Sequence, residues 1–212
     1  MRPTTGGVGA PSVPTDQGMP PHGPAGEAEE RGFYSVYLPE HTPIPVRRET
    51  PPATGGDELD EGYARTMDPL ISLAAAAAVT ERIKLYASVP VLAVPPAFAA
   101  RMAVTIDSIS HGRFAINIVS GWQKAEYDQM NIWPGQEHFL RRYDYCAEYV
   151  TIMKQLWETG GSDFKGQFFT MNECVLKQQP TAKIDIICAG QGQTGADFAA
   201  AHANRKCTRP HS

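Results

Sequence analysis

The sequence has few of the features that mark disulfide-rich, metal-binding or membrane proteins. Its four cysteines are Cys146, Cys174, Cys188 and Cys207, and no two of them have the C-x-x-C spacing of many metal and redox sites. This pattern predicts free thiols in a reducing, cytoplasmic compartment and gives no indication of a metal site. The most apolar run, from Leu70 to Val79, is mostly alanine and is too short to span a bilayer.

An excess of basic residues is also absent. Lysine and arginine number 19 and aspartate and glutamate 23, which gives a formal net charge of −4 at pH 7. A chain without a basic surface is not expected to bind nucleic acid. The hydrophobic fraction of 42% over 212 residues is enough to bury one good core, so the default expectation is a single globular domain.

Three stretches have no apolar periodicity. Residues 1–26 are rich in glycine, proline, serine and threonine, which predicts a disordered leader. Residues 42–60 form a long loop of proline, glycine and acidic residues, a composition typical of a lid or a disordered segment. Residues 204–212 are predicted to be an unrelated tail, which leaves the folded domain at 27–203.

Within that domain, strands and helices alternate. Apolar runs predict strands at 34–38, 83–89, 113–119 and 183–189, and the sequence between them predicts helices at 69–79, from Pro95 onward, and over the stretch that ends near Trp157. Residues 160–179 are predicted to be a short β excursion. Alternating strands and helices indicate parallel βα units, an α/β fold. In the helix from Pro95, one face is expected to be formed by Phe98, Met102, Thr105, Ile106 and Ile109.

Asn117 interrupts the apolar run of the strand at 113–119. In parallel α/β folds, ligands gather at the carboxyl ends of strands, so this amide is well placed to hydrogen-bond the polar edge of a ring. The structural alternative is an asparagine that satisfies neighbouring backbone groups.

Two arginines, Arg141 and Arg142, fall in the first turns of the following predicted helix. The partial positive charge of a helix N-terminus makes this a poor place for cations unless an anion such as phosphate binds there. The alternative is that they pair with Glu137 or Asp144 on a solvated face.

Two weaker signals accompany these residues. His41 follows a strand, where a ring nitrogen can meet a flavin or a substrate, although a histidine in a loop is often only a surface residue. The stretch AGQGQTGADFAAA turns from the last strand into a helix through a glycine-rich bend whose backbone N–H groups can hold a phosphate.

The stretch GRFAINIVSGWQKAEYDQMNIWPG, followed by RRYDYCAEYV, GGSDFKGQFFTMNECVLKQQP and ICAGQ, resembles the pyrimidine monooxygenase branch of the bacterial luciferase-like flavin monooxygenases. The resemblance runs from about residue 74 to residue 203 and implies a (β/α)8 (TIM) barrel that uses FMN. It implies that the family's flavin-binding positions are occupied here by Asn117, Glu126, Arg142, Tyr143 and Gly192. The last of these is a serine in the family, so Gly192 keeps a backbone N–H but lacks the hydroxyl.

The same resemblance implies an activity and partners. Reduced FMN, supplied by a separate NAD(P)H-dependent flavin reductase, would react with dioxygen to open a pyrimidine such as uracil. Asn117 would contact the ring system or substrate, Glu126 a polar edge, and Arg142, Tyr143 and Gly192 the phosphate side. No catalytic residue is named. Sulfonate and sulfone monooxygenases share the scaffold, so the substrate stays open, as does assembly into an oligomer.

Two alternatives remain. The earlier stretches EAEERGFYSVYLPEH and LDEGYARTMDPLISLAAAAAVTERIKL are closer to the deazaflavin-dependent oxidoreductases of the same superfamily. Moreover, four predicted strands are half of the eight that close a barrel, which predicts a partial barrel, weak flavin binding or a non-catalytic fragment.

Overall fold

A computed structural model describes residues 15–41, 45, 61–121, 124–188 and 192–206, with the backbone alone for 205–206. The elements follow in chain order. They are α1 (Gly23–Glu30), β1 (Ser35–Leu38), the 3-10 helix η1 (Glu61–Arg65), α2 (Pro69–Val79), β2 (Lys84–Pro90), α3 (Pro96–Ile109), β3 (Phe114–Val119), α4 (Lys124–Gln129), α5 (Gln136–Leu140), α6 (Arg142–Thr159), β4 (Gly161–Ser162), β5 (Cys174–Val175), β6 (Asp185–Cys188), α7 (Gln193–His202) and β7 (Arg205–Lys206).

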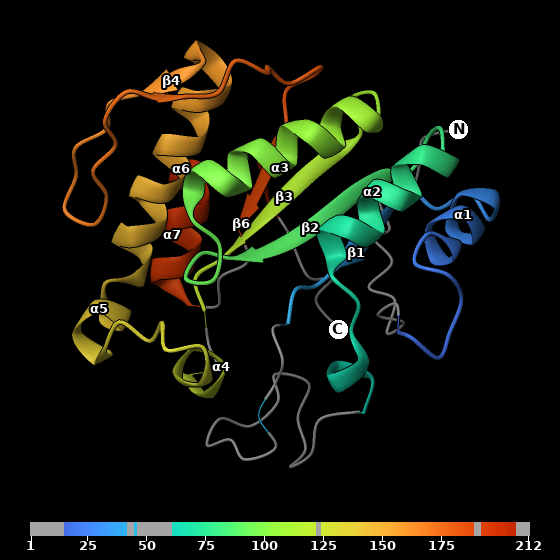
Figure 1. The fold of residues 1–212 in the computed structure, drawn as a ribbon, viewed down its shortest axis with the longest axis horizontal. Coiled ribbons are helices and arrows are strands. Elements are labelled where there is room, and N and C mark those ends of the chain that lie inside the picture. Colours follow the sequence, from blue (N-terminus) through green and yellow to red (C-terminus); the bar gives the residue numbers. More distant parts are fainter. Residues whose placement is uncertain (1–14, 42–44, 46–60, 122–123, 189–191, 207–212) are drawn as a thin grey trace.

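The main sheet is parallel, with the strand order β1-β2-β3-β6-β7 among the described residues. Each longer strand is joined to its neighbour through a helix, so α2, α3 and α6 pack on one face of the sheet (Figure 1). The short strands β4 and β5 form a separate antiparallel pair at residues 161–175, which confirms the predicted β excursion. The four predicted strands and the α/β class are therefore confirmed.

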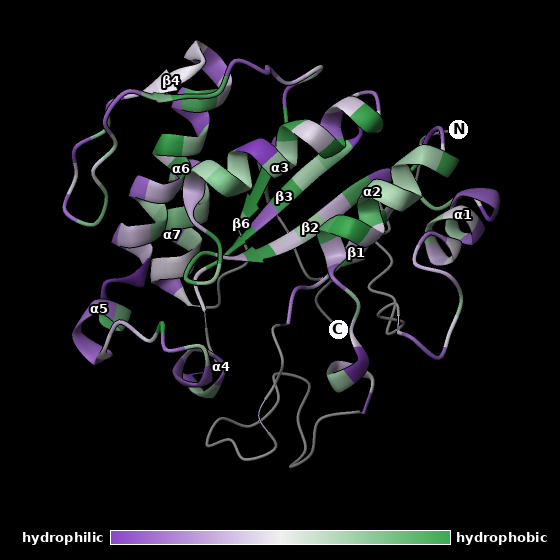
Figure 2. Cartoon of the chain, viewed as in Figure 1, coloured by the Kyte–Doolittle hydropathy of each residue, from purple (hydrophilic) through white to green (hydrophobic). Residues whose placement is uncertain are grey.

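The core lies between the sheet and its helices, because β2 and β3 are buried over nearly their whole length and β3 is mostly apolar (Figure 2). Leu85, Ile116 and Ile118 are buried there with Val150 and Met153 of α6. Burial of such side chains is the main favourable term in folding.

The face of α3 that packs on the sheet differs from the predicted one. Phe98 and Ile109 are 54% and 39% exposed, whereas the small residues Ala99, Ala100 and Ala103 are buried. Alanines allow the helix to approach the sheet closely, because they add little volume between the two backbones. The periodicity therefore indicated a helix correctly, but of the five residues of the predicted face only Ile106 is buried.

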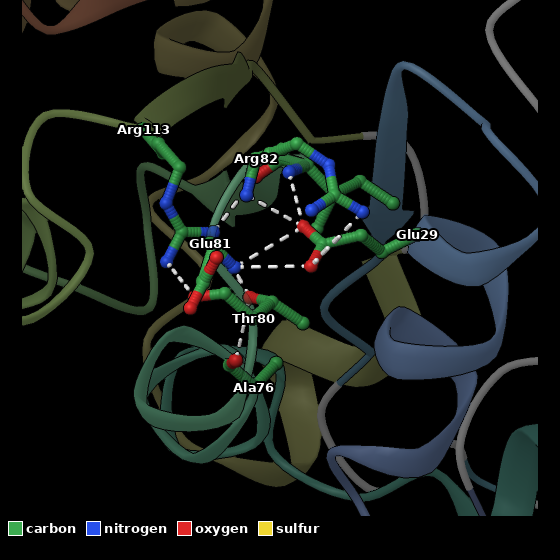
Figure 3. A network of polar contacts seen from close by, with 7 residues as sticks. Glu29, Ala76, Thr80, Glu81, Arg82 and Arg113 are labelled. Carbon is green, nitrogen blue, oxygen red and sulfur yellow. Dashed lines mark hydrogen bonds and ion pairs between the residues drawn. The ribbon is translucent and has the colours of Figure 1, made fainter.

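The amino-terminal edge of the sheet is held by a polar network around the buried side chain of Arg113 (Figure 3). The Arg113 guanidinium donates to the carbonyl oxygens of Ala77, Thr80, Ile83 and Ser110 and to the Thr80 hydroxyl. The Glu29 carboxylate of α1 accepts the backbone N–H groups of residues 81–83. This network fixes α1 and the end of α2 to the start of β2.

The folded part extends past both expected boundaries. Thr15 forms a β bridge with Thr66, and α1 begins at Gly23, where Ala25 is buried, although residues 1–26 were expected to be a disordered leader. At the other end, Asn204 exchanges two hydrogen bonds with Ile186, and β7 pairs with β6. Residues 1–14 and 207–212 lie outside the described residues, as does most of the predicted loop at 42–60.

Candidate functional site

The elements that contain the predicted site residues meet at the carboxyl edge of the parallel sheet. Asn117 lies near the end of β3, and α4 and α5 lie beyond the arrowhead of that strand (Figure 1). The α6 helix begins after them, and α7 follows the end of β6. Because parallel strands end at one edge, this topology gathers the predicted residues where such folds bind ligands.

Asn117 is buried on the face of the sheet that points away from α3. Its Nδ2 donates a hydrogen bond of 3.0 Å to the Ser88 hydroxyl, and the two residues are paired in register across β2 and β3. The side chain is only 4% exposed. The contact with Ser88 fixes the orientation of the amide and gives Asn117 a side-chain partner in the protein itself.

Glu126 and His41 come together although 85 positions separate them in the chain. Glu126 is buried on α4, and its Oε1 lies 3.6 Å from Nδ1 of His41. The ring of Tyr63 meets the His41 ring edge-on at 4.9 Å between centroids. The His41 side chain is 14% exposed, so it is not the surface residue of the alternative interpretation.

Glu40 adds a second carboxyl group beside this pair. Burial is the largest cause that raises its pKa, to about 7, and the nearby carboxylates of Asp68 and Glu126 raise it further while His41 opposes them. A carboxyl group with this pKa exchanges protons near neutral pH, which is a common property of functional sites.

The two arginines have different partners. Arg141 is the N-cap of α6, not part of its first turn, and it pairs with Asp144 at 3.1 Å and with the Gln167 side chain. Arg142 donates from Nη1 to the Phe139 carbonyl oxygen at 3.1 Å, and no described carboxylate pairs with it. The surface-pairing alternative therefore holds for Arg141, whereas the Arg142 cation is not neutralised by the described residues.

Tyr143 joins the start of α6 to α7. Its ring lies 5.5 Å from the Phe198 ring between centroids. Gly192 precedes α7 as its N-cap with φ 85° and ψ 172°, a backbone conformation that residues with a side chain rarely adopt. The first hydrogen bond of that helix runs from the Ala196 N–H to the Gly192 carbonyl, so the N–H groups of residues 193–195 have no intrahelical acceptor.

Sequence reasoning did not single out several residues of this edge. Ser88 is a polar residue within a predicted buried strand, and the parallel register that places it beside Asn117 could have been inferred from two adjacent βα units. Tyr63, Phe139 and Asp68 had no such signal, because their contacts depend on loops whose path is set by tertiary packing.

The described residues contain three free cysteines, Cys146, Cys174 and Cys188, and Cys207 lies outside them. Burial raises the pKa of the Cys146 and Cys188 thiols, each to about 12, so neither is a thiolate at neutral pH. Within the part of the chain that the structure describes, no helix is long and apolar enough to cross a membrane.

Residues 24–206 match the sequence model of a family described as luciferase-like monooxygenase. The chain belongs to this family. It is 54% identical over 144 residues to the pyrimidine monooxygenase RutA of Enterobacter sp. (strain 638), an alignment that covers 68% of this chain and 40% of that protein. It is 53% identical over 144 residues to the RutA of Escherichia coli O7:K1 (strain IAI39 / ExPEC), of which it covers 44%. The chain thus spans less than half the length of these relatives.

Solved structures show the same fold at low sequence identity. DmoA from Hyphomicrobium sulfonivorans superposes with a TM-score of 0.70 at 22% identity, over 88% of this chain and 44% of that one. An F420-dependent secondary alcohol dehydrogenase superposes with a TM-score of 0.69 at 22% identity, over 86% of this chain and 51% of that one. Together with the family match, these structures confirm the prediction of a partial luciferase-like barrel, and the two relatives confirm the predicted similarity to pyrimidine monooxygenases.

Proposed function

We propose that this chain binds FMN at the carboxyl edge of its sheet and takes part in the oxygenation of a pyrimidine ring. The reduced flavin would come from a separate NAD(P)H-dependent reductase, and dioxygen would be the co-substrate. The main support is topological, because the five predicted residues lie in β3, α4, α6 and the start of α7, elements that begin or end at one edge of a luciferase-like sheet. Sequence identity to two pyrimidine monooxygenases suggests the substrate class.

The residues at the starts of α6 and α7 fit a phosphate group. Arg142 has a cationic side chain that no described carboxylate neutralises, and Tyr143 has a phenolic hydroxyl. Among the described residues, no atom lies within 4 Å of the position that a Cβ of residue 192 would occupy, so an anion can approach the Gly192 backbone and the helix N-terminus closely. Guanidinium, hydroxyl and backbone N–H groups are the donors that phosphate sites use.

Asn117 and Glu126 fit the opposite, ring end of a flavin. The Asn117 amide is held by Ser88 on the inner face of the sheet, and an amide can both donate to and accept from the polar edge of a ring. Glu126 is buried at the start of the segment that follows β3. Its carboxylate accepts hydrogen bonds from ring N–H groups or ribityl hydroxyls.

Bound reduced flavin supplies the electrons that activate dioxygen for insertion into the substrate ring. The part of this chain is to bind the flavin, orient it and control protons near it. Glu40, in the chain next to His41 and near Glu126, can exchange a proton near neutral pH, because burial raises its pKa to about 7. A cytoplasmic location is proposed as well, because free thiols fit a reducing compartment.

Flavin titration of the purified chain tests the proposal. FMN is added to the wild-type chain and to Arg142→Ala and Asn117→Ala variants, and binding is followed by quenching of flavin fluorescence. We expect saturable binding that each substitution weakens. Leu140→Ala serves as the control, since Leu140 is 71% exposed on the neighbouring helix. Absence of FMN binding, or equal binding by all four proteins, contradicts the proposal.

Two further measurements separate the alternatives. Tighter binding of the deazaflavin cofactor than of FMN favours a deazaflavin-dependent oxidoreductase. If FMN binds, adding NADH, a flavin reductase and uracil tests turnover, with consumption of uracil measured by chromatography. Binding without turnover favours a non-catalytic fragment.

A further inference from the structure

The Arg142 guanidinium lies between two aromatic rings. Its Cζ is 4.6 Å from the centroid of the Phe139 ring and 5.0 Å from that of the Tyr143 ring. Nη1 also donates to the Phe139 carbonyl oxygen. Phe139 therefore contacts Arg142 through both its side chain and its backbone.

These contacts orient the side chain without neutralising it. A ring face attracts a cation through its quadrupole but has no net charge, whereas a carboxylate would compete with an incoming anion. The neighbouring Arg141 shows the contrast, because it is paired with Asp144. An arginine that is already held in place also loses less rotamer freedom when it binds a ligand.

Phe139 is itself held by a row of aromatic rings. Its ring lies 5.1 Å from the Trp133 ring, and Trp133 lies 6.3 Å from Tyr127 between centroids. Tyr127 is fully buried on α4, with its ring against Gly121. The row connects the segment after β3 with the start of α6, so packing in α4 and α5 sets the position of the arginine.

We propose that Phe139 is a positioning residue for recognition of the flavin phosphate, acting by holding Arg142 as an uncompensated cation. This inference rests on the proposed function. It applies to a phosphate monoester, so it predicts discrimination between FMN and riboflavin, which differ only in that group. Phe139 has no part in recognition of the flavin ring.

The test measures the ratio of the riboflavin Kd to the FMN Kd for the full chain by flavin fluorescence. Phe139→Leu removes the ring and is expected to lower this ratio about fivefold, the loss of one cation–π contact, with the riboflavin Kd unchanged. Phe139→Tyr keeps an aromatic ring at this position, so the ratio should stay at its wild-type value. Leu140→Ala, an exposed neighbour on the same helix, should leave it unchanged.

A double-substitution cycle separates positioning from a general loss of structure. In an Arg142→Ala background, Phe139→Leu should have no further effect on the ratio, because the guanidinium that it positions is absent. If Phe139→Leu weakens both flavins equally, or still lowers the ratio without Arg142, the proposal is wrong while FMN binding stands. If neither flavin binds the wild-type chain, the proposed function and this inference both fail.

Discussion

His41 Nδ1 and Glu126 Oε1 lie 3.6 Å apart and link the loop after β1 to the helix after β3. Glu40, next to His41 in the chain, is influenced by the same carboxylate. The structure thus couples two βα units through ionisable side chains at the edge where the flavin is proposed to bind. This coupling can be tested by removing one charge at a time.

The Glu126→Gln variant should lower the pKa of Glu40 from about 7. Burial is the largest cause of the raised pKa and remains in the variant, but the repulsion by the Glu126 carboxylate is lost. The shift is therefore expected to be downward and smaller than one unit. NMR titration of the glutamate side-chain carboxyl carbons measures it. Glu137→Gln, an exposed change on α5, is the control, and an unchanged or higher Glu40 pKa in Glu126→Gln contradicts the prediction.

Glu40 should make the protein less stable as the pH rises through neutrality. The unfolded chain releases this proton near pH 4.5, whereas the folded protein keeps it until about pH 7, so the folded state binds more protons between these values. The free energy of unfolding then falls with increasing pH across that window and is lowest above it.

Glu40→Gln removes this dependence. The difference in the free energy of unfolding between the variant and the wild type should be about 1 to 2 kcal/mol larger at pH 8 than at pH 4.5. This value allows for solvent screening of a partly exposed group. Urea denaturation at pH 4.5, 6, 7 and 8 gives the free energy of unfolding. In the control variant Glu137→Gln, the free energy of unfolding should change with pH as it does in the wild type. A Glu40→Gln advantage that is the same at every pH is the result that would disprove the assignment.

The strands could be predicted from the sequence, whereas the contact between His41 and Glu126 could not. The strands around Leu85 and Ile116 were predictable because a continuous apolar run reports burial on both faces of a sheet. Asn117 was found because a polar residue breaks such a run. The contact between His41 and Glu126 was not predictable, because it depends on the path of two loops that no local pattern specifies.

Short elements were missed for a related reason. The α4 helix has six residues and α5 has five, too few to show an amphipathic period, so neither helix was predicted from the sequence. The β7 strand has only two residues and both are basic, so it has no apolar pattern and is recognised by its backbone pairing with β6. The buried face of α3 was predicted correctly only at Ile106, because large side chains such as Phe98 suggested the core more strongly than alanines did.

Arg113 should be essential for stability and irrelevant to flavin recognition. It donates five hydrogen bonds at the amino-terminal edge of the sheet and is 7% exposed. Arg113→Met leaves buried carbonyl oxygens without a donor and should cost about 3 to 5 kcal/mol in urea denaturation. Arg101→Met, on the outer side of α3, should cost less than about 1 kcal/mol. Equal losses for the two variants would argue against the network as a major support of the fold.

Gly192 allows a test that separates backbone strain from phosphate binding. The position has φ 85°, so Gly192→Ala and Gly192→Ser should each lower the free energy of unfolding by about 1 to 3 kcal/mol, although no atom of the residues that the structure describes lies within 4 Å of the added Cβ. The two variants share this strain and differ in one hydroxyl. If the start of α7 binds the flavin phosphate, the serine variant should bind FMN about fivefold more tightly than the alanine variant, while their riboflavin affinities stay equal. Equal FMN affinities in fluorescence titrations would place the phosphate away from this helix.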